Sequence, residues 1–168
     1  MRALILLLAL VFISCNAPTI PETGQHFQLT VNASPSCPKS GEGNLIDRQF
    51  TFKIMLIDET TRLTFQMPTR PQVSGPDSGS LTIVITPTST GVTGSIAGEA
   101  LTSDGVHDVA FFLDQHQGNA RLIGTGDYSQ KTFSGTLDGQ ISMSIFGSSS
   151  GGECIAADHT WKLTPLFD

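Results

Sequence analysis

Short runs of apolar residues at every second position limit the fold of this chain more than any other feature of its sequence. Ten such runs follow one another, and turn-forming or polar residues separate them. Side chains of a β-strand alternate between its two faces, so a period of two predicts strands with one buried face. The residues that mark the runs are Phe27, Leu29 and Val31; Phe50, Phe52, Ile54 and Leu56; Leu63, Phe65 and Met67; Leu81, Ile83 and Ile85; Val92, Gly94, Ile96 and Gly98; Val109, Phe111 and Leu113; Leu122, Gly124 and Gly126; Phe133, Gly135 and Leu137; Ile141, Met143 and Ile145; and His159, Trp161 and Leu163.

This pattern predicts an all-β fold, a single antiparallel meander of about 8–10 strands. Short, regularly spaced strands with turn residues between them are typical of closed barrels and of sandwiches, and a meander is the simplest path through either. The composition favours sheet over helix, because charged residues make up only 14% of the chain while it contains 17 glycines.

One segment, residues 105–116, is compatible with either a strand or a helix. Its apolar residues Val106, Val109, Ala110 and Leu113 fall at helical spacing after a possible cap. The adjacent aromatic residues at 111–112 suit a strand that is partly covered on both faces. We therefore favour a strand and keep a single helix as the alternative.

The start of the chain has the layout of an export signal. One charge at Arg2 precedes an uninterrupted apolar run over residues 3–13, which is too short for a membrane span of about 20 residues. The following Ser14 and Cys15 resemble the lipobox of bacterial lipoproteins, in which the cysteine is lipidated and becomes the mature N-terminus. The resemblance implies a signal peptide over residues 1–14 and a lipid on Cys15 that attaches the protein to a membrane.

The same resemblance implies a domain organisation and a location. Residues 15–24 hold two prolines and no alternating pattern, so we expect a lipidated tether there, followed by one β-barrel domain over residues 25–168. Asn16 stands where an aspartate retains lipoproteins in the inner membrane, which favours the outer membrane of a bacterial envelope. Cleavage after Ala17, which would give a free periplasmic or secreted protein, is the alternative.

The charge of the chain excludes some classes of partner. Nine Lys and Arg stand against fifteen Asp and Glu, which gives a net charge of −6, and loss of Arg2 with a signal peptide would make the protein more acidic still. Nucleic acids and anionic lipid surfaces are bound through basic patches, so we expect neither as a partner of the folded domain.

The cysteines left after Cys15 bear on the choice between barrel and sandwich. Cys37 follows the first predicted strand and Cys154 precedes the last, and an even pair in an exported protein predicts a disulfide. A disulfide between them would make the terminal strands neighbours, so we favour a closed β-barrel over a β-sandwich. A closed meander whose last strand carries the lone Trp161 resembles the calycin barrels, the architecture of lipocalins and avidins.

Glycines at inward positions leave two interpretations open. Gly94, Gly98, Gly124, Gly126 and Gly135 share the face of the apolar residues in their strands. They either let the sheet coil tightly, with space for Trp161, or leave room for a small apolar ligand inside the barrel. His107 and His159 begin strands on the apolar parity, so they are further candidates for lining the interior.

Motifs for catalysis and metal binding are weak. The segment Gly147–Gly151 satisfies the G-x-S-x-G pattern around Ser149, but the helix that follows a nucleophile elbow is not predicted. A flexible Ser/Gly-rich loop explains the match. The histidines and cysteines have no spacing that supplies three or four ligands, so we predict no metal site, no catalytic residue and no cofactor.

The sequence therefore favours a non-catalytic, membrane-anchored envelope lipoprotein whose barrel is a scaffold or a binding module. Its partner would be a small apolar ligand in the interior or another envelope component bound through loops such as residues 68–80. The alternative from a different class is a serine hydrolase that uses Ser149 and His159.

Overall fold

The computed structural model describes residues 24–38, 45, 49–67, 78–103, 108–114, 120–145 and 151–167. These residues form strands and turns, and the predicted all-β class is confirmed. No helix in the described ranges is long and apolar enough to cross a bilayer. The strands are β1 (His26–Asn32), β2 (Gln49–Asp58), β3 (Leu63–Gln66), β4 (Ser78–Gly79), β5 (Thr82–Pro87), β6 (Val92–Ser103), β7 (Asp108–Asp114), β8 (Ala120–Asp127), β9 (Thr132–Ile145) and β10 (Gly151–Pro165).

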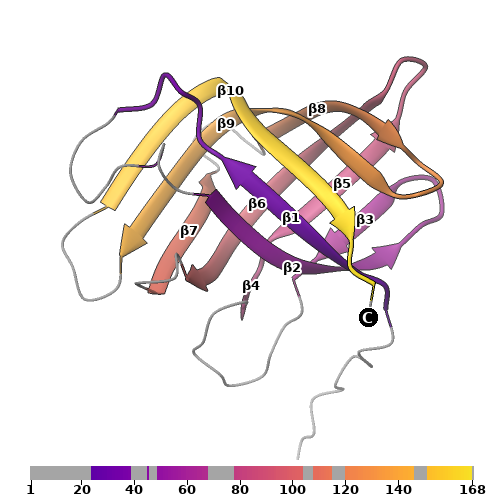
Figure 1. Ribbon diagram of the computed structural model, residues 1–168, viewed down its shortest axis with the longest axis horizontal. Coiled ribbons are helices and arrows are strands. Elements are labelled where there is room, and N and C mark those ends of the chain that lie inside the picture. Colours follow the sequence, from indigo (N-terminus) through magenta and orange to yellow (C-terminus); the bar gives the residue numbers. More distant parts are fainter. Residues whose placement is uncertain are drawn as a thin grey trace, which may run out of the picture.

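The ten strands occupy eight positions around one closed antiparallel barrel (Figure 1). β4 and β5 share one position, because both pair with the long strand β6. β7 and β8 share another, because both lie between β6 and β9. Around the ring the chain passes from each position to its neighbour, and β10 finally pairs with β1. The predicted meander and the closed barrel are both confirmed.

The seam of the barrel joins the first strand to the last. The ladder between β1 and β10 runs from Phe27 opposite Pro165 to Asn32 opposite Thr160. Beyond Asn32 the chain turns away from the ladder, while β10 continues along β9 toward Gly151. The disulfide between Cys37 and Cys154 spans this place, with Cα atoms 5.6 Å apart, as predicted from the cysteine positions.

The predicted boundaries were wrong at the C-terminal end. The runs at Phe133 and Ile141, predicted as two strands, belong to the single strand β9, because Gly139 continues the ladder opposite Ala156 and does not turn. The last strand begins at Gly151, eight residues before the predicted His159, so Cys154 lies within it.

A β-bulge in β10 explains why the parity of its residues changes along the strand. Ala156 pairs with Gly139 and His159 with Leu137, so three steps on β10 match two on β9. The extra residue lets Cys154, before the bulge, and His159, after it, face the same side. Both are buried.

The structure decides the segment that was compatible with strand or helix. Residues 108–114 form β7, which pairs with β6 on one side and β9 on the other, so the strand interpretation is confirmed for them. The remaining residues of that segment, 105–107 and 115–116, lie outside the described ranges.

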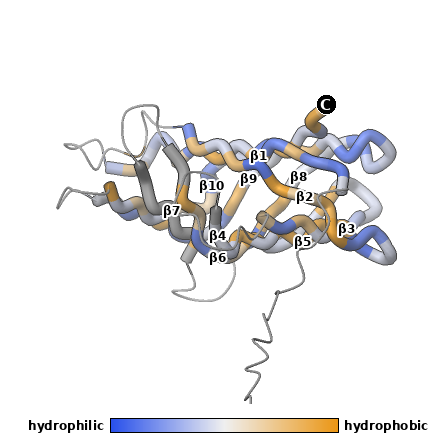
Figure 2. The backbone as a smooth tube through the Cα atoms, turned by 90° about the horizontal axis from the view of Figure 1, so that it is seen from below, coloured by the Kyte–Doolittle hydropathy of each residue, from blue (hydrophilic) through white to orange (hydrophobic). Residues whose placement is uncertain are grey.

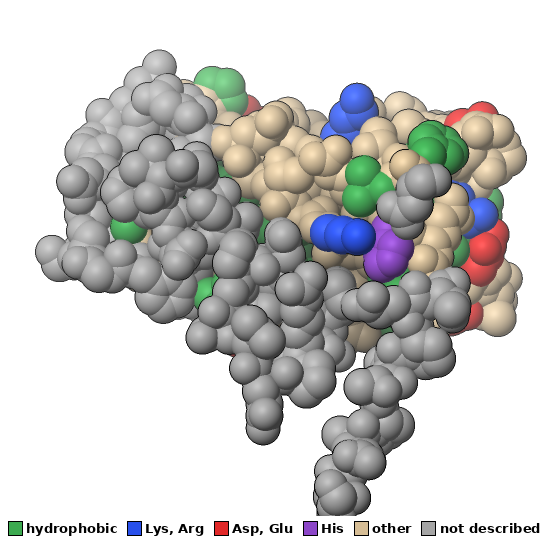
Figure 3. All heavy atoms as spheres, turned by 60° about the horizontal axis from the view of Figure 1, so that its bottom comes forward, with side chains coloured by type: hydrophobic (Ala, Val, Ile, Leu, Met, Phe, Trp, Pro, Cys, Tyr) green, Lys and Arg blue, Asp and Glu red, His purple; other side chains and the backbone are tan. Residues whose placement is uncertain are grey.

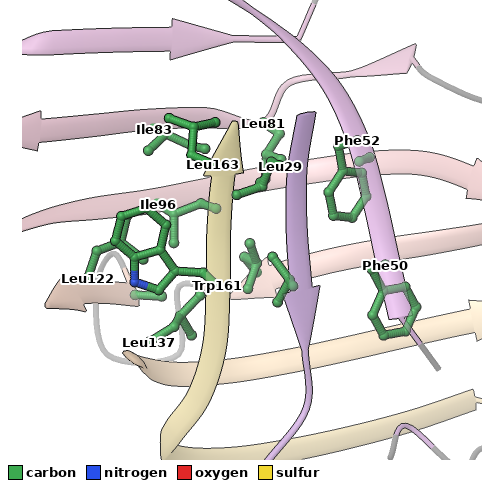
Figure 4. Close-up of a cluster of buried hydrophobic side chains, with 14 of the residues drawn as sticks. Leu29, Phe50, Phe52, Leu81, Ile83, Ile96, Leu122, Leu137, Trp161 and Leu163 are labelled. Carbon is green, nitrogen blue, oxygen red and sulfur yellow. The ribbon is translucent and has the colours of Figure 1, made fainter. Parts of the chain in front are cut away.

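The inner face of the barrel is lined by large apolar side chains (Figure 4). Hydrophobic and hydrophilic residues alternate along the strands (Figure 2), and the rings of Phe27 and Phe65 pack edge to face with centroids 4.9 Å apart. The largest fully buried side chains are Trp161, Phe27, Phe52, Phe65, Phe133, Leu29, Leu45, Ile54, Leu63, Met67 and Leu81.

The outer face carries mainly uncharged polar side chains. Hydroxyl residues occupy outward positions on the strands around the seam, and Asn32 Nδ2 donates a hydrogen bond to Thr160 Oγ1 across it, at 3.2 Å. In the space-filling view, a few charged groups lie among the uncharged ones on the described part of this side, and acidic and basic groups adjoin at its right edge (Figure 3). The outward hydroxyl residues include Thr30, Thr51, Thr125, Ser134, Thr136, Thr160 and Thr164.

Candidate functional site

Cys37, Cys154 and His159, which the sequence singled out, lie close together where the chain leaves the seam. Residues 33–38, which we call the strap, follow β1 and lie against β10 on both sides of its bulge. A turn shapes the strap, because Cys37 N donates to Ser34 O at 3.0 Å around Pro35. The turn directs Cys37 into the core, where it is 3% exposed and bonded to Cys154.

His159 is the second attachment between the strap and β10. The backbone N–H of Ser34 donates to His159 Nδ1 at 2.9 Å, and both residues are completely buried. Because Nδ1 accepts this bond, the ring proton must be on Nε2, which therefore donates to the carbonyl oxygen of Gly139 at 3.2 Å. The two hydrogen bonds fix one neutral tautomer of the imidazole.

Burial lowers the pKa of His159 below its ordinary value, because the charged ring would lose its hydration. Hydrogen bonds to the backbone of Gly139 and Cys154 oppose this change, as do the negative charges of Asp158 and Asp138. The loss of hydration is the largest of these effects, so His159 is neutral at pH 7 and becomes protonated only under more acidic conditions.

The cluster has the composition of a small metal site but not its chemistry. The two Sγ atoms of Cys37 and Cys154 and a ring nitrogen of His159 lie within 4.8 Å of one another. Zinc is bound by thiolates, and here both sulfurs are joined in the disulfide. The imidazole alone supplies fewer than the three or four ligands that a stable site needs.

Trp161 lies two residues beyond His159, inside the barrel. Its indole packs beside Leu122 and Leu137 (Figure 4), and the residue is 2% exposed. The indole N–H donates to the carbonyl oxygen of Thr136 at 3.0 Å and more weakly to that of Ile123 at 3.4 Å. A buried indole therefore has its single donor paired.

The inward glycines lie against the backbone of adjacent strands. A Cβ added to Gly94, Gly124, Gly126 or Gly135 would come within 2.5 Å of a carbonyl oxygen of a neighbouring strand, and one added to Gly98 would lie 2.6 Å from that of Ser80, between β4 and β5. Gly126 is exposed, so it does not line the interior. Gly124 and Gly135 oppose each other in the β8–β9 ladder, and a Cβ on Gly124 would also lie 3.0 Å from Trp161. Close strand approach and space for the indole thus account for these glycines in the described structure.

Gly98 has a further requirement. Its φ of 120° is a conformation that side chains rarely adopt, and it lies opposite the break between β4 and β5, close to Ser80 and Leu81. This glycine lets β6 pair continuously with two separate short strands.

The structure brings some of the predicted residues together and leaves others undescribed. Cys37, Cys154 and His159 form one cluster, and Trp161 lies beside Gly124 and opposite Gly135 of the β9 ladder. His107, Ser149 and the lipidation residue Cys15 lie outside the described ranges.

Two buried polar residues were missed by the sequence reasoning. Ser34 has no apolar pattern around it, and no local signal relates it to a histidine 125 residues away. Gln140 is 8% exposed on β9 and donates through Nε2 to Ser142 Oγ at 3.3 Å and to Glu153 Oε2 at 3.2 Å.

No family model, curated protein or solved structure matches this chain.

Proposed function

We propose that this chain is an exported lipoprotein of a bacterial envelope, anchored through Cys15, whose barrel is a non-catalytic scaffold that binds another envelope component. The observation that carries the proposal is the disulfide between Cys37 and Cys154. Disulfides persist in oxidising compartments, and the remaining cysteine, Cys15, ends the apolar run at the start of the chain.

The packing of the barrel supports a scaffold over a carrier. Large side chains occupy the inner face, and the positions of the inward glycines are taken up by neighbouring strands and by Trp161. The hydroxyl-rich outer face is suited to water rather than to acyl chains. The lipid on Cys15 would then supply the membrane attachment, and the barrel would present its loops to a partner.

Metabolic labelling with palmitate tests the anchor. We expect wild-type protein expressed in a bacterium to incorporate label and Cys15→Ser to incorporate none, because the thiol that accepts the lipid is gone. Cys154→Ser is the matched control, since it removes a cysteine but leaves the export signal intact, and it should remain labelled. Equal labelling of wild type and Cys15→Ser would refute the lipoprotein proposal.

Dye binding tests the scaffold. A barrel that carries a small apolar ligand should take up a hydrophobic dye while Trp161 remains buried, whereas a packed scaffold should not. Dye uptake by the folded protein would favour the carrier function instead.

A further inference from the structure

We propose that the strap, residues 33–38, is an acid-sensitive closure of the barrel, with His159 as its lock and the Cys37–Cys154 disulfide as its hinge. Acid would release the hydrogen bond at the lock while the covalent hinge keeps the strap attached.

The β1–β10 ladder ends where the strap begins. Asn32 and Thr160 form its last pair, and Ser34 and His159 lie just beyond them. Among the described residues, the contact that continues the seam is therefore a backbone N–H bonded to a side chain, at 2.9 Å. A ladder of amides does not titrate near neutral pH, but an imidazole does.

Protonation of His159 would break its hydrogen bond to Ser34. His159 Nδ1 must keep its lone pair to accept the Ser34 N–H, while Nε2–H already donates to Gly139. Protonation of Nδ1 would place two donors face to face and a positive charge in a fully buried position. The lock therefore holds only while the ring is neutral.

Two carboxylates act on the imidazole of His159. The nearest charges are Asp158 on β10 and Asp138 on β9, which favour the protonated ring but do not offset the effect of burial on its pKa. The strap offers no ionisable group of its own beyond Cys37, which is bonded to Cys154. Protonation of His159 is thus not compensated by a charge in the segment that must move.

The strap is attached to β10 by the disulfide as well as by the lock. It is held together internally, because Ser36 N donates to Ser34 Oγ at 3.0 Å and Cys37 N donates to Ser34 O at 3.0 Å. The disulfide does not titrate. Loss of the lock would therefore let the turn swing about Cys37 as a unit and uncover the part of the inner face beneath it.

The direction of the pH dependence follows from the lowered pKa of His159 in the closed form. The open form regains a histidine with a pKa of about 6.5 and binds more protons. The closed form is fully favoured above that pH, and the population of the open form rises by up to tenfold per pH unit below it. The population of the open form stops rising once the pH falls below the pKa of His159 in the closed form.

The rate at which a phosphine reduces the disulfide tests the proposal, because Cys37 and Cys154 are only 3% and 8% exposed while the strap is closed. We measure this rate from pH 7.5 to 4.5 for wild type and for His159→Gln, whose amide oxygen accepts the Ser34 N–H without titrating. The ratio of the wild-type rate to the His159→Gln rate should rise by up to tenfold per pH unit below about 6.5. His26→Gln, which removes a histidine remote from the strap, should behave as wild type.

A constant ratio over this range would overturn the proposal, and so would exposure of Trp161 over the same pH range, because the acid effect would then be global unfolding. If His159→Gln does not fold, hydrogen exchange of the wild-type protein replaces it. The protection factor of the Ser34 amide should fall between pH 7 and pH 5, by up to tenfold per pH unit below about 6.5, while that of Val31 in β1 is unchanged. Parallel behaviour of the two amides would refute the lock.

Discussion

Replacing both Cys37 and Cys154 with alanine should lower the free energy of unfolding by about 4 kcal/mol. The two cysteines are 117 residues apart, so the disulfide closes most of the chain into one loop. The chain-entropy relation gives about 4.9 kcal/mol for a loop of this length, and native disulfides typically contribute about 2–5 kcal/mol. For a small domain with a total stability of about 5–15 kcal/mol, the loss would be large.

Guanidinium unfolding followed by Trp161 fluorescence measures this loss, because the lone tryptophan is buried in the barrel. With a denaturant slope of about 3 kcal/mol per molar, the midpoint should fall by more than 1 M. Reduced wild-type protein is the matched control, since it lacks the crosslink but keeps both sulfur atoms in the core. Reduction alone should cause most of the loss of stability that the double alanine variant shows. A loss below about 1 kcal/mol in both proteins would refute the reasoning that the crosslink restricts the unfolded chain.

Two further substitutions test the packing around the seam and the glycines. Gly98→Ala should destabilise the protein by about 1–3 kcal/mol, because its φ of 120° and the nearby Ser80 backbone disfavour a side chain. Thermal unfolding measures the loss. Gly91→Ala is the control, because Gly91 is a turn glycine without positive φ, and a comparison of the two variants shows whether the backbone conformation matters. Trp161→Phe should lower the free energy of unfolding by about 1–3 kcal/mol, because it removes the indole donor and leaves the Thr136 carbonyl without that partner. Urea unfolding followed by circular dichroism measures this loss. An unchanged midpoint would contradict a stabilising role of the indole N–H.

Much of the barrel could be predicted because alternation is a local property. Phe27, Leu29 and Val31 indicate β1 regardless of what they pair with, since one face of the strand must be buried. The cysteines then supplied the long-range relation that alternation lacks. A disulfide between Cys37 and Cys154 requires neighbouring terminal strands, and the structure has them.

The features that could not be predicted depend on pairing rather than on local sequence. Asp138 and Gly139 have the composition of a turn, yet Gly139 lies in the middle of β9, because strands on both sides extend the ladder past it. The bulge before His159 has no signal in the sequence, although it decides which face Cys154 occupies. The bond between Ser34 and His159 depends on both the seam and the bulge, so it could not be found without them.

The position of the seam has a consequence for how the barrel is assembled. One edge of the first strand pairs with β2, which follows it in the chain, but its other edge pairs only with the last strand. Residues such as Asn32 and Thr160, bonded across that seam, are 128 positions apart. Contacts of this sequence separation form slowly, because a long loop must close before they are gained. A chain that emerges from its N-terminus would remain an open, curled sheet with a bare strand edge until its final strand of 15 residues appears. The chain is therefore most prone to aggregation while this edge is unpaired, and pairing of the last strand removes that risk.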